Sequence, residues 1–212
     1  MSRPLDIGVG QIKSLLIKMG RLGVEATEKA LESFYKGEDI YFQIRAMSNT
    51  IQMMAEEVED RATELIALHQ PMASDLRILK AYIKISYDLE RYGRYAMDIS
   101  ELQYRVGEWA PLEEEGLTIR ELASKTLQTM EMSLQMIETM DAKMIFDLSK
   151  IETDTDDLYF KNMKKLTECD GAPKTVVAYL LTIRYLERIA DHASYIAESI
   201  SYASTGKRIT IR

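Results

Sequence analysis

Apolar residues recur every three or four positions along almost the whole chain, a spacing that places them on one face of an α-helix. Short runs containing Gly, Pro or Asp interrupt this pattern and predict helix ends. The apolar seam of the last segment is typical: Tyr179, Ile183, Leu186, Ala190, Ala193, Ala197 and Ile200. The pattern predicts an all-α protein. Its expected helices span residues 5–35, 40–68, 74–104, 117–140, 141–166 and 174–203.

A sequence phrase in the third predicted helix returns in the sixth. Residues 88–101 are DLERYGRYAMDISE and residues 185–198 are YLERIADHASYIAE. A repeat of such a long period indicates a duplicated structural unit. We therefore predict two tandem three-helix bundles, residues 1–107 and 108–212, joined through the Gly- and Pro-containing stretch RVGEWAPLEEEG. The last eight residues, TGKRITIR, are expected to form a loose tail.

Composition narrows the class of protein. Apolar residues make up 46% of the chain, and 10 Gly and 4 Pro are too few for a turn-rich all-β fold. A formal charge of −7 argues against nucleic-acid binding, which needs a basic face. The single cysteine, Cys169, allows no internal disulfide and fits a reducing compartment.

We expect neither a signal peptide nor a membrane-spanning helix. The start, MSRPLDIGVGQIK, lacks the charged and then apolar segments of a signal peptide. The longest apolar stretch, residues 176–183, is far shorter than the ~20 residues that a spanning helix needs. We expect a cytoplasmic protein without direct membrane insertion.

Two pairs of carboxylates have the spacing of a metal site. Glu187 and Asp191 are four residues apart on the last helix, and Glu152 and Asp156 have the same spacing on the helix before it. If these helices pack antiparallel, four carboxylates could converge on one face. An all-oxygen cluster suits a hard cation such as Mg²⁺, Ca²⁺, Mn²⁺ or ferric iron.

A plainer interpretation of the same spacing is a charged, solvated helix face. Glu187 and Asp191 would then pair with Arg184 and Arg188, and the carboxylates of the preceding helix would face water. A ferritin-like di-iron site is not indicated, because neither histidine follows a Glu by three residues. For His192 we expect only a hydrogen bond at the edge of the bundle.

The sequence offers no constellation typical of an enzyme. It contains no G-x-S-x-G and no glycine-rich phosphate loop, and Cys169 has no evident histidine partner. These observations favour a binding or regulatory protein.

Taken together, HQPMASDLRILKAYIKISYDLER and LERIADHA resemble the PhoU family of phosphate-uptake regulators. The resemblance covers nearly the whole chain and includes the duplication. It implies two three-helix bundles in a cytoplasmic protein that damps phosphate import. The implied partners are the ATPase of the phosphate ABC transporter and, in many bacteria, a sensor histidine kinase. Met and Tyr on helix faces make a homodimer plausible.

The resemblance also implies metal clusters held by E(D)-x-x-x-D motifs, two in each bundle. The second bundle keeps both motifs, and the predicted ligands are Glu152, Asp156, Glu187 and Asp191. Iron, manganese, magnesium and calcium all remain candidate cations.

The first bundle departs from the family's motifs. Glu90 is present, but Arg94 stands where the second carboxylate should be, and the partner motif falls at Ser48 and Gln52. A cationic Arg94 would oppose a metal and could pair with Glu90 instead. One metal site is therefore predicted rather than two.

The prediction is a non-enzymatic negative regulator of phosphate uptake, acting as an adaptor on the transporter. Two alternatives stay open from the sequence. One is a helical protein that stores or buffers metal through its carboxylate cluster. The other is a helical scaffold that binds no ligand.

Overall fold

The computed structural model describes residues 3–109, 112 and 116–211, and within these ranges it contains helices and no strand. The elements are α1 Pro4–Lys36, α2 Tyr41–His69, α3 Ala73–Val106, α4 Ile119–Thr139, the 3₁₀ turn η1 Ala142–Met144, α5 Ile145–Glu168 and α6 Pro173–Thr205. The all-α prediction is confirmed. The predicted helix that begins at residue 141 was placed slightly early, because η1 occupies its first turn.

Prolines and glycines set the ends of the longest helices. Pro4 and Pro173 occupy the first turns of α1 and α6, where a missing N–H costs nothing. Gly37 and Gly206 follow the last turns with φ of 71° and 73°, in the left-handed region that favours glycine.

Ser74 and Asp75, at the predicted start of this helix, are residue types that often cap helices, but neither caps α3. Met72 holds the capping position in an extended conformation, and no side chain caps the helix there. Asp75 lies in the first turn instead, where it forms an ion pair with Arg3 over 3.2 Å. The negative charge of Asp75 still stabilises the N-terminal end of α3, because it interacts favourably with the helix dipole.

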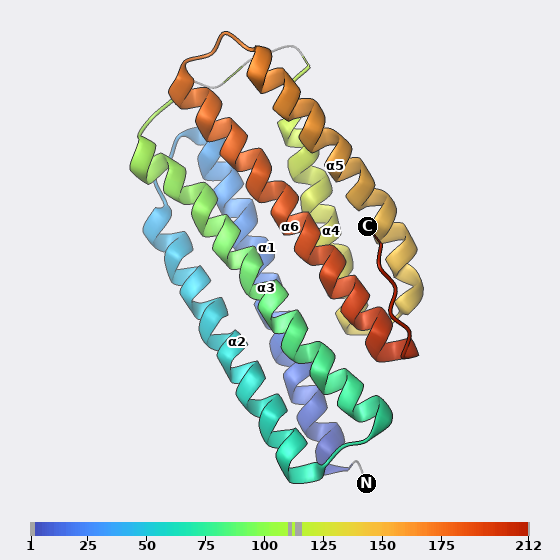
Figure 1. Cartoon of the computed structure of the whole chain (residues 1–212). Coiled ribbons are helices and arrows are strands. Elements are labelled where there is room, and N and C mark those ends of the chain that lie inside the picture. The colour runs from blue at the N-terminus through green and yellow to red at the C-terminus, as the bar shows by residue number, and fades with distance from the viewer. Residues whose placement is uncertain (1–2, 110–111, 113–115, 212) are drawn as a thin grey trace.

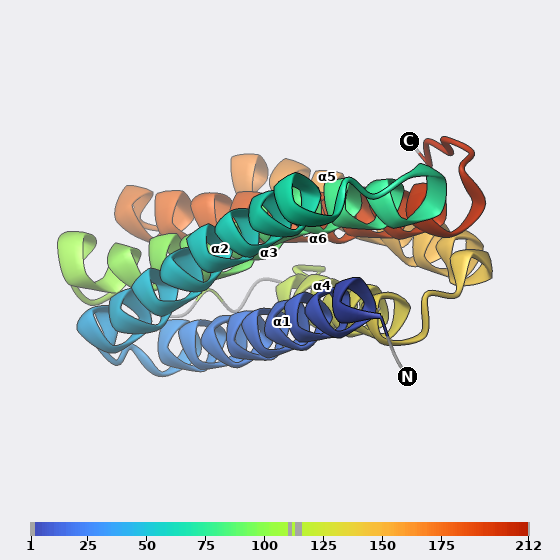
Figure 2. The same ribbon diagram turned by 90° about the horizontal axis from the view of Figure 1, so that it is seen from below.

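The helices form two groups of three that lie side by side (Figure 1). In each group the last helix is central, so α3 and α6 run antiparallel along the middle of the molecule. Seen from below, α1 and α4 form one layer, and α2, α3, α6 and α5 form the other (Figure 2). The predicted junction at 105–116 includes residues 110, 111 and 113–115, which lie outside the described residues.

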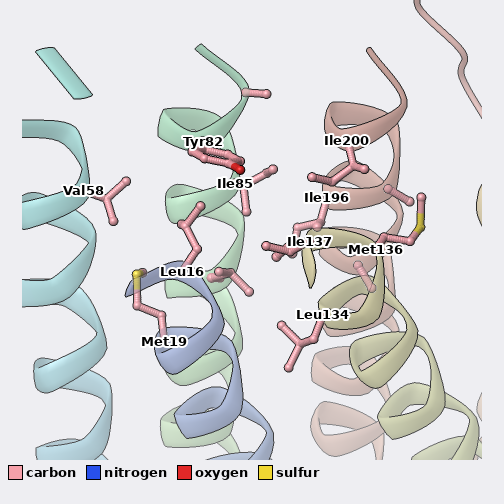
Figure 3. Packing of buried hydrophobic residues seen from close by; sticks show 14 of the residues in the cluster. Leu16, Met19, Val58, Tyr82, Ile85, Leu134, Met136, Ile137, Ile196 and Ile200 are labelled. Carbon is pink, nitrogen blue, oxygen red and sulfur yellow. The ribbon is translucent and has the colours of Figure 1, made fainter. Parts of the chain in front are cut away.

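The buried apolar core crosses the boundary between the two groups. One cluster joins Leu16 of α1 and Ile85 of α3 to Leu134 of α4 and Ile196 of α6, all fully buried (Figure 3). A second cluster likewise draws from α1 to α3 and from α4 to α6. Each three-helix group therefore buries much of its apolar surface against the other.

Contacts between α3 and α6 show an approximate two-fold relation between the halves. Asp88 and Tyr185 occupy equivalent positions of the repeated phrase, 97 residues apart, and so do Tyr95 and His192. Asp88 contacts His192, with 2.8 Å between Oδ1 and Nδ1. The equivalent pair, Tyr185 and Tyr95, also meets, with its rings stacked 6.0 Å apart. One contact thus occurs twice, with different side chains.

The described part of the C-terminal tail is not loose, contrary to the prediction. The backbone N–H of Ile211 donates to Glu198 of α6 over 3.2 Å, and Ser149 of α5 donates to the Ile211 carbonyl over 3.5 Å. Ile209 and Ile211 both pack against the apolar cluster. Alternate apolar residues in KRITIR explain this placement, because they give the extended tail one apolar side.

Candidate metal centre

Three of the four predicted ligands come together between α5 and α6. Glu152 and Asp156 on α5 and Asp191 on α6 each offer a carboxylate oxygen, and these oxygens all lie within 4.8 Å of one another. The four-residue spacing on α5 places its two carboxylates on the face that α6 covers. Three of the four carboxylates that were predicted to converge are thus close together, two from α5 and one from α6.

Burial separates this cluster from an ordinary solvated charge patch. Glu152 and Asp191 are only 4% and 1% exposed, and Asp156 is half-buried. Glu152 therefore does not face water, as the plainer interpretation of its helix expected. Like charges held close together out of water are costly unless a cation compensates them.

The donor set fits a hard cation. Carboxylate oxygens bind Ca²⁺ at about 2.3–2.6 Å and Mg²⁺ at about 2.0–2.1 Å, so two oxygens of one ion lie no more than about 5 Å apart for Ca²⁺ and about 4 Å apart for Mg²⁺. The three oxygens, all within 4.8 Å of one another, meet the limit for Ca²⁺, and a smaller cation would draw them closer together. Three carboxylates leave other coordination positions for water or a further ligand.

Glu187, the fourth predicted ligand, lies outside this group. Its Oε2 accepts hydrogen bonds from Arg184 and from Arg188, each over 2.9 Å, and its Oε1 accepts another from Arg188 over 3.1 Å. The pairing of Glu187 with these two arginines is the arrangement that the plainer interpretation expected. The side chain would have to leave both arginines to reach a cation.

Arg188 connects Glu187 to the cluster. Its guanidinium also forms an ion pair with Asp191 over 3.1 Å. Burial opposes the charge of Arg188, but the hydrogen bond and the charge of Glu187 outweigh it and raise the pKa of the guanidinium. The cluster therefore has one fixed positive neighbour, which offsets part of its negative charge and would compete with a bound cation.

In the first half, the positions that match the two metal-binding motifs are not all carboxylates. Arg94 forms an ion pair with Asp98 over 3.8 Å rather than with Glu90, which corrects the expected pairing. Gln52 donates to Glu56 over 3.2 Å. Ser48 is buried where α2 passes close to Gly93 of α3. Within the described residues the carboxylate cluster is found in the second half only.

His192 lies in a more central position than the predicted edge of a bundle. It is buried between α3 and α6, and its ring hydrogen-bonds Asp88, which is 2% exposed. The rings of Tyr87, Tyr95 and Tyr195 surround it at 5.5–6.3 Å. The sequence does contain a signal for this contact, because the two copies of the repeat differ there: position 88 is Asp, whereas the equivalent position 185 is Tyr.

Comparison with known proteins decides the family. The family model described as "PhoU domain" matches the chain twice, over residues 16–103 and 119–200. The chain belongs to the PhoU family. The two PhoU matches coincide with the two groups of helices and confirm the duplication that the repeated phrase indicated.

Curated PhoU relatives match over most of their length. A "Phosphate-specific transport system accessory protein PhoU homolog" from Synechocystis is 27% identical over 205 residues, covering 93% of this chain and 90% of that protein. A protein of the same description from Caulobacter vibrioides is 32% identical over 164 residues, covering 76% of this chain and 71% of its own.

Solved PhoU structures share the fold. The PhoU structure from Streptococcus pneumoniae gives a TM-score of 0.88 at 22% identity, covering 97% of this chain and 99% of that one. The structure from Pseudomonas aeruginosa also gives 0.88, at 24% identity, covering 95% and 99%.

Proposed function

We propose that this PhoU protein is a cytoplasmic, non-enzymatic negative regulator of phosphate uptake. It would act as an adaptor that contacts the ATPase of a phosphate ABC transporter and, where one is present, a sensor histidine kinase. The observation that carries the proposal is the double match to the PhoU domain. The names of relatives that match over nearly their whole length, which describe accessory proteins of phosphate-specific transport, support it further.

Two structural observations are compatible with this role. No described helix is both long and apolar enough to cross a bilayer. The thiol of Cys169 donates to the Leu166 carbonyl over 3.3 Å, and the buried ring of His192 bonds Asp88 over 2.8 Å, so these two side chains do not form a nucleophile–base pair with each other.

Deleting the gene tests the regulatory proposal. Loss of a negative regulator should raise phosphate uptake and intracellular phosphate or polyphosphate, and complementation should reverse both. Affinity capture at high and low phosphate should recover the transporter ATPase with the protein. Unchanged uptake in the deletion strain would contradict the proposal.

We also propose that the carboxylate cluster binds one hard multivalent cation, with iron, manganese, magnesium and calcium as candidates. Glu152, Asp156 and Asp191 would be its ligands, and Glu187 is the predicted fourth. The cation would offset the repulsion of buried carboxylates and tie α5 to α6. Binding should weaken as pH falls, because protonated carboxyl groups are poor ligands.

Metal titration of single variants separates the roles of the four carboxylates. Asp191→Asn should weaken binding at least tenfold. Glu187→Gln should weaken it only if Glu187 leaves its arginines on binding. Glu90→Gln, in the first half, serves as the matched control and should leave binding unchanged. Equal uptake by the intact protein and the Asp191→Asn variant would refute the site, and loss on changing Glu90 would place it in the other half.

The homodimer is part of the same proposal. Several large apolar or aromatic side chains are exposed on helix faces, among them Met53 at 60% and Tyr104 at 47%. Exposed groups of this kind are common at interfaces between subunits. Light scattering of the purified protein at micromolar concentration should give the mass of two chains, and a mass near 24.3 kDa would contradict this part of the proposal.

A further inference from the structure

A small cavity of about 200 Å³ lies where α3, α6 and the C-terminal tail meet, and none of the three clustered carboxylates lines it. Three cationic side chains line it: Lys80 and Lys84 from α3 and Arg208 from the tail. Lys80 and Lys84 are four residues apart, so they lie on the same face of α3. Within the described ranges, none of these three cations forms an ion pair with a carboxylate.

The lining has an excess of positive charge. Glu198 is the acidic residue among the described residues that line the cavity. One of its carboxylate oxygens already accepts the backbone N–H of Ile211 over 3.2 Å. Within the lining, three cations stand against one carboxylate, on a protein whose formal net charge is −7; Lys84 also lines a neighbouring hollow with Glu56, Glu59 and Glu90. A surplus of this kind, gathered around a hollow, attracts anions.

The rest of the lining is mixed. Tyr202 and Thr210, which carry hydroxyl groups, line the cavity together with Ser199 and the apolar Ala81 and Ile209. The guanidinium of Arg208 lies over the Tyr202 ring at 5.5 Å, and the ammonium of Lys84 lies 5.7 Å from the Tyr195 ring. These cation–π contacts help to hold both cations near the cavity.

We propose that this cavity binds a small phosphate-type oxyanion. Lysine ammonium groups and an arginine fork are the side chains that proteins use for phosphate oxygens, and hydroxyls supply further hydrogen bonds. The volume is below the roughly 300–1,000 Å³ of pockets for drug-sized molecules. The cavity therefore suits inorganic phosphate or pyrophosphate better than a whole nucleotide.

The site joins segments that are distant in the sequence. Lys80 and Lys84 belong to the first half of the chain, and Arg208 belongs to the C-terminal tail of the second half. An anion held by all three cations would fasten the tail to α3 as well as to α6. Because the proposal needs only the purified protein, its outcome does not depend on transporter contact or on metal binding.

Isothermal titration of the full-length protein with orthophosphate and, separately, with pyrophosphate tests the site. The double variant Lys80→Gln/Lys84→Gln should bind at least tenfold more weakly than the intact protein. The matched control is Lys161→Gln/Lys164→Gln, which removes the same charge from exposed positions of α5 and should bind normally. The anion that binds more tightly identifies the ligand.

A second measurement follows the tail. Bound anion should slow trypsin cleavage after Lys207 and Arg208 in the intact protein, and Arg208→Gln should lose anion binding while keeping the helical circular dichroism spectrum. Saturable binding that the Lys80/Lys84 or Arg208 variants lose supports the proposal. Absence of saturable binding for both anions, or equal binding by the Lys80/Lys84 variant and its control, overturns it.

Discussion

Single buried residues hold the two halves of this PhoU protein together in a specific way. The carboxylate of Asp88 and the ring of His192 come from different halves, and both are nearly inaccessible to water. A polar group in such a place stabilises the fold only while its partner is present, because an unpaired buried donor or acceptor carries its full desolvation cost.

Asp88→Ala should therefore destabilise the protein by about 1–3 kcal/mol, the cost of leaving a buried ring nitrogen of His192 without its partner. Asp88→Asn is the matched control, since its amide oxygen can still accept a hydrogen bond, and it should cost less. Urea unfolding followed by circular dichroism measures both. Equal losses in the two variants would show that the hydrogen bond contributes nothing beyond packing.

Asp98 should make stability depend on pH. Burial raises the pKa of its carboxyl group, and Arg94 opposes this only in part. Because the folded protein then holds the proton more tightly than the unfolded chain, ionisation lowers stability as pH rises through the folded pKa. Asp98→Asn should be more stable than the intact protein at pH 7, by about 0.5 kcal/mol.

The same gain should vanish below the ordinary aspartate value of 3.8, where the carboxyl is protonated in both states. Thermal unfolding of the two proteins at several pH values gives the comparison. A gain that is constant with pH would mean that the charge of Asp98 is not its cause.

At the scale of helices, glycines determine how closely neighbours approach. At Gly93 of α3, a Cβ would lie 2.7 Å from Ile51 Cδ1 and 3.3 Å from the Ser48 Cα, so the side chain and the backbone of α2 both limit the space. At Gly10 of α1, no atom lies within 4 Å of a Cβ. Two helical glycines of the same chain thus have opposite surroundings.

Gly93→Ala should cost about 1–3 kcal/mol, because the added methyl overpacks the contact between α2 and α3. Gly10→Ala should instead stabilise the protein by roughly 0.5–1 kcal/mol, because alanine loses less backbone entropy in a helix. Thermal unfolding of the two variants against the parent tests the pair. A stabilising Gly93→Ala would show that α2 can move away from α3 at little cost.

The sequence predicted the helices well because a periodic apolar seam is a local signal. It did not indicate the role of Asp75 at the start of α3 or the placement of the tail, where contacts distant in the sequence decide the structure. Asp75 is a residue type that often caps helices, yet it lies in the first turn and pairs with Arg3, which directly precedes α1. The tail was expected to be loose, yet Ile209 and Ile211 find an apolar surface that only the folded helices provide.

The sequence predicted the part of the candidate site that depends on local helical spacing. It did not predict the part that depends on contacts between side chains. A four-residue spacing places Glu152 and Asp156 on one face of α5, and no tertiary information is needed for that step. Whether Glu187 joins them depends on the positions of Arg184 and Arg188 around it, which spacing alone does not specify.

For the molecule as a whole, the shared core predicts a single cooperative transition. Both apolar clusters take residues from both halves, so neither half keeps its core when the other unfolds. Trp109, whose ring lies 5.3 Å from that of Phe34, reports on one end of the molecule by fluorescence. Its urea transition should coincide with the transition of helical circular dichroism.

Residues 1–107 expressed alone provide the matching test. They should aggregate or lose fixed packing, because an apolar face that α4 and α6 normally cover becomes exposed. Separate midpoints for fluorescence and circular dichroism, or a stable monomeric fragment, would show that the halves fold independently.

The doubled contact between α3 and α6 has an evolutionary consequence. A contact repeated about a two-fold axis is what a symmetric dimer of identical chains makes. In such an ancestor, position 88 of each copy would meet position 95 of the other with identical chemistry on both sides. Once the two copies are joined in one chain, each side can mutate alone: here one became Asp88 with His192, and the other became Tyr185 with Tyr95.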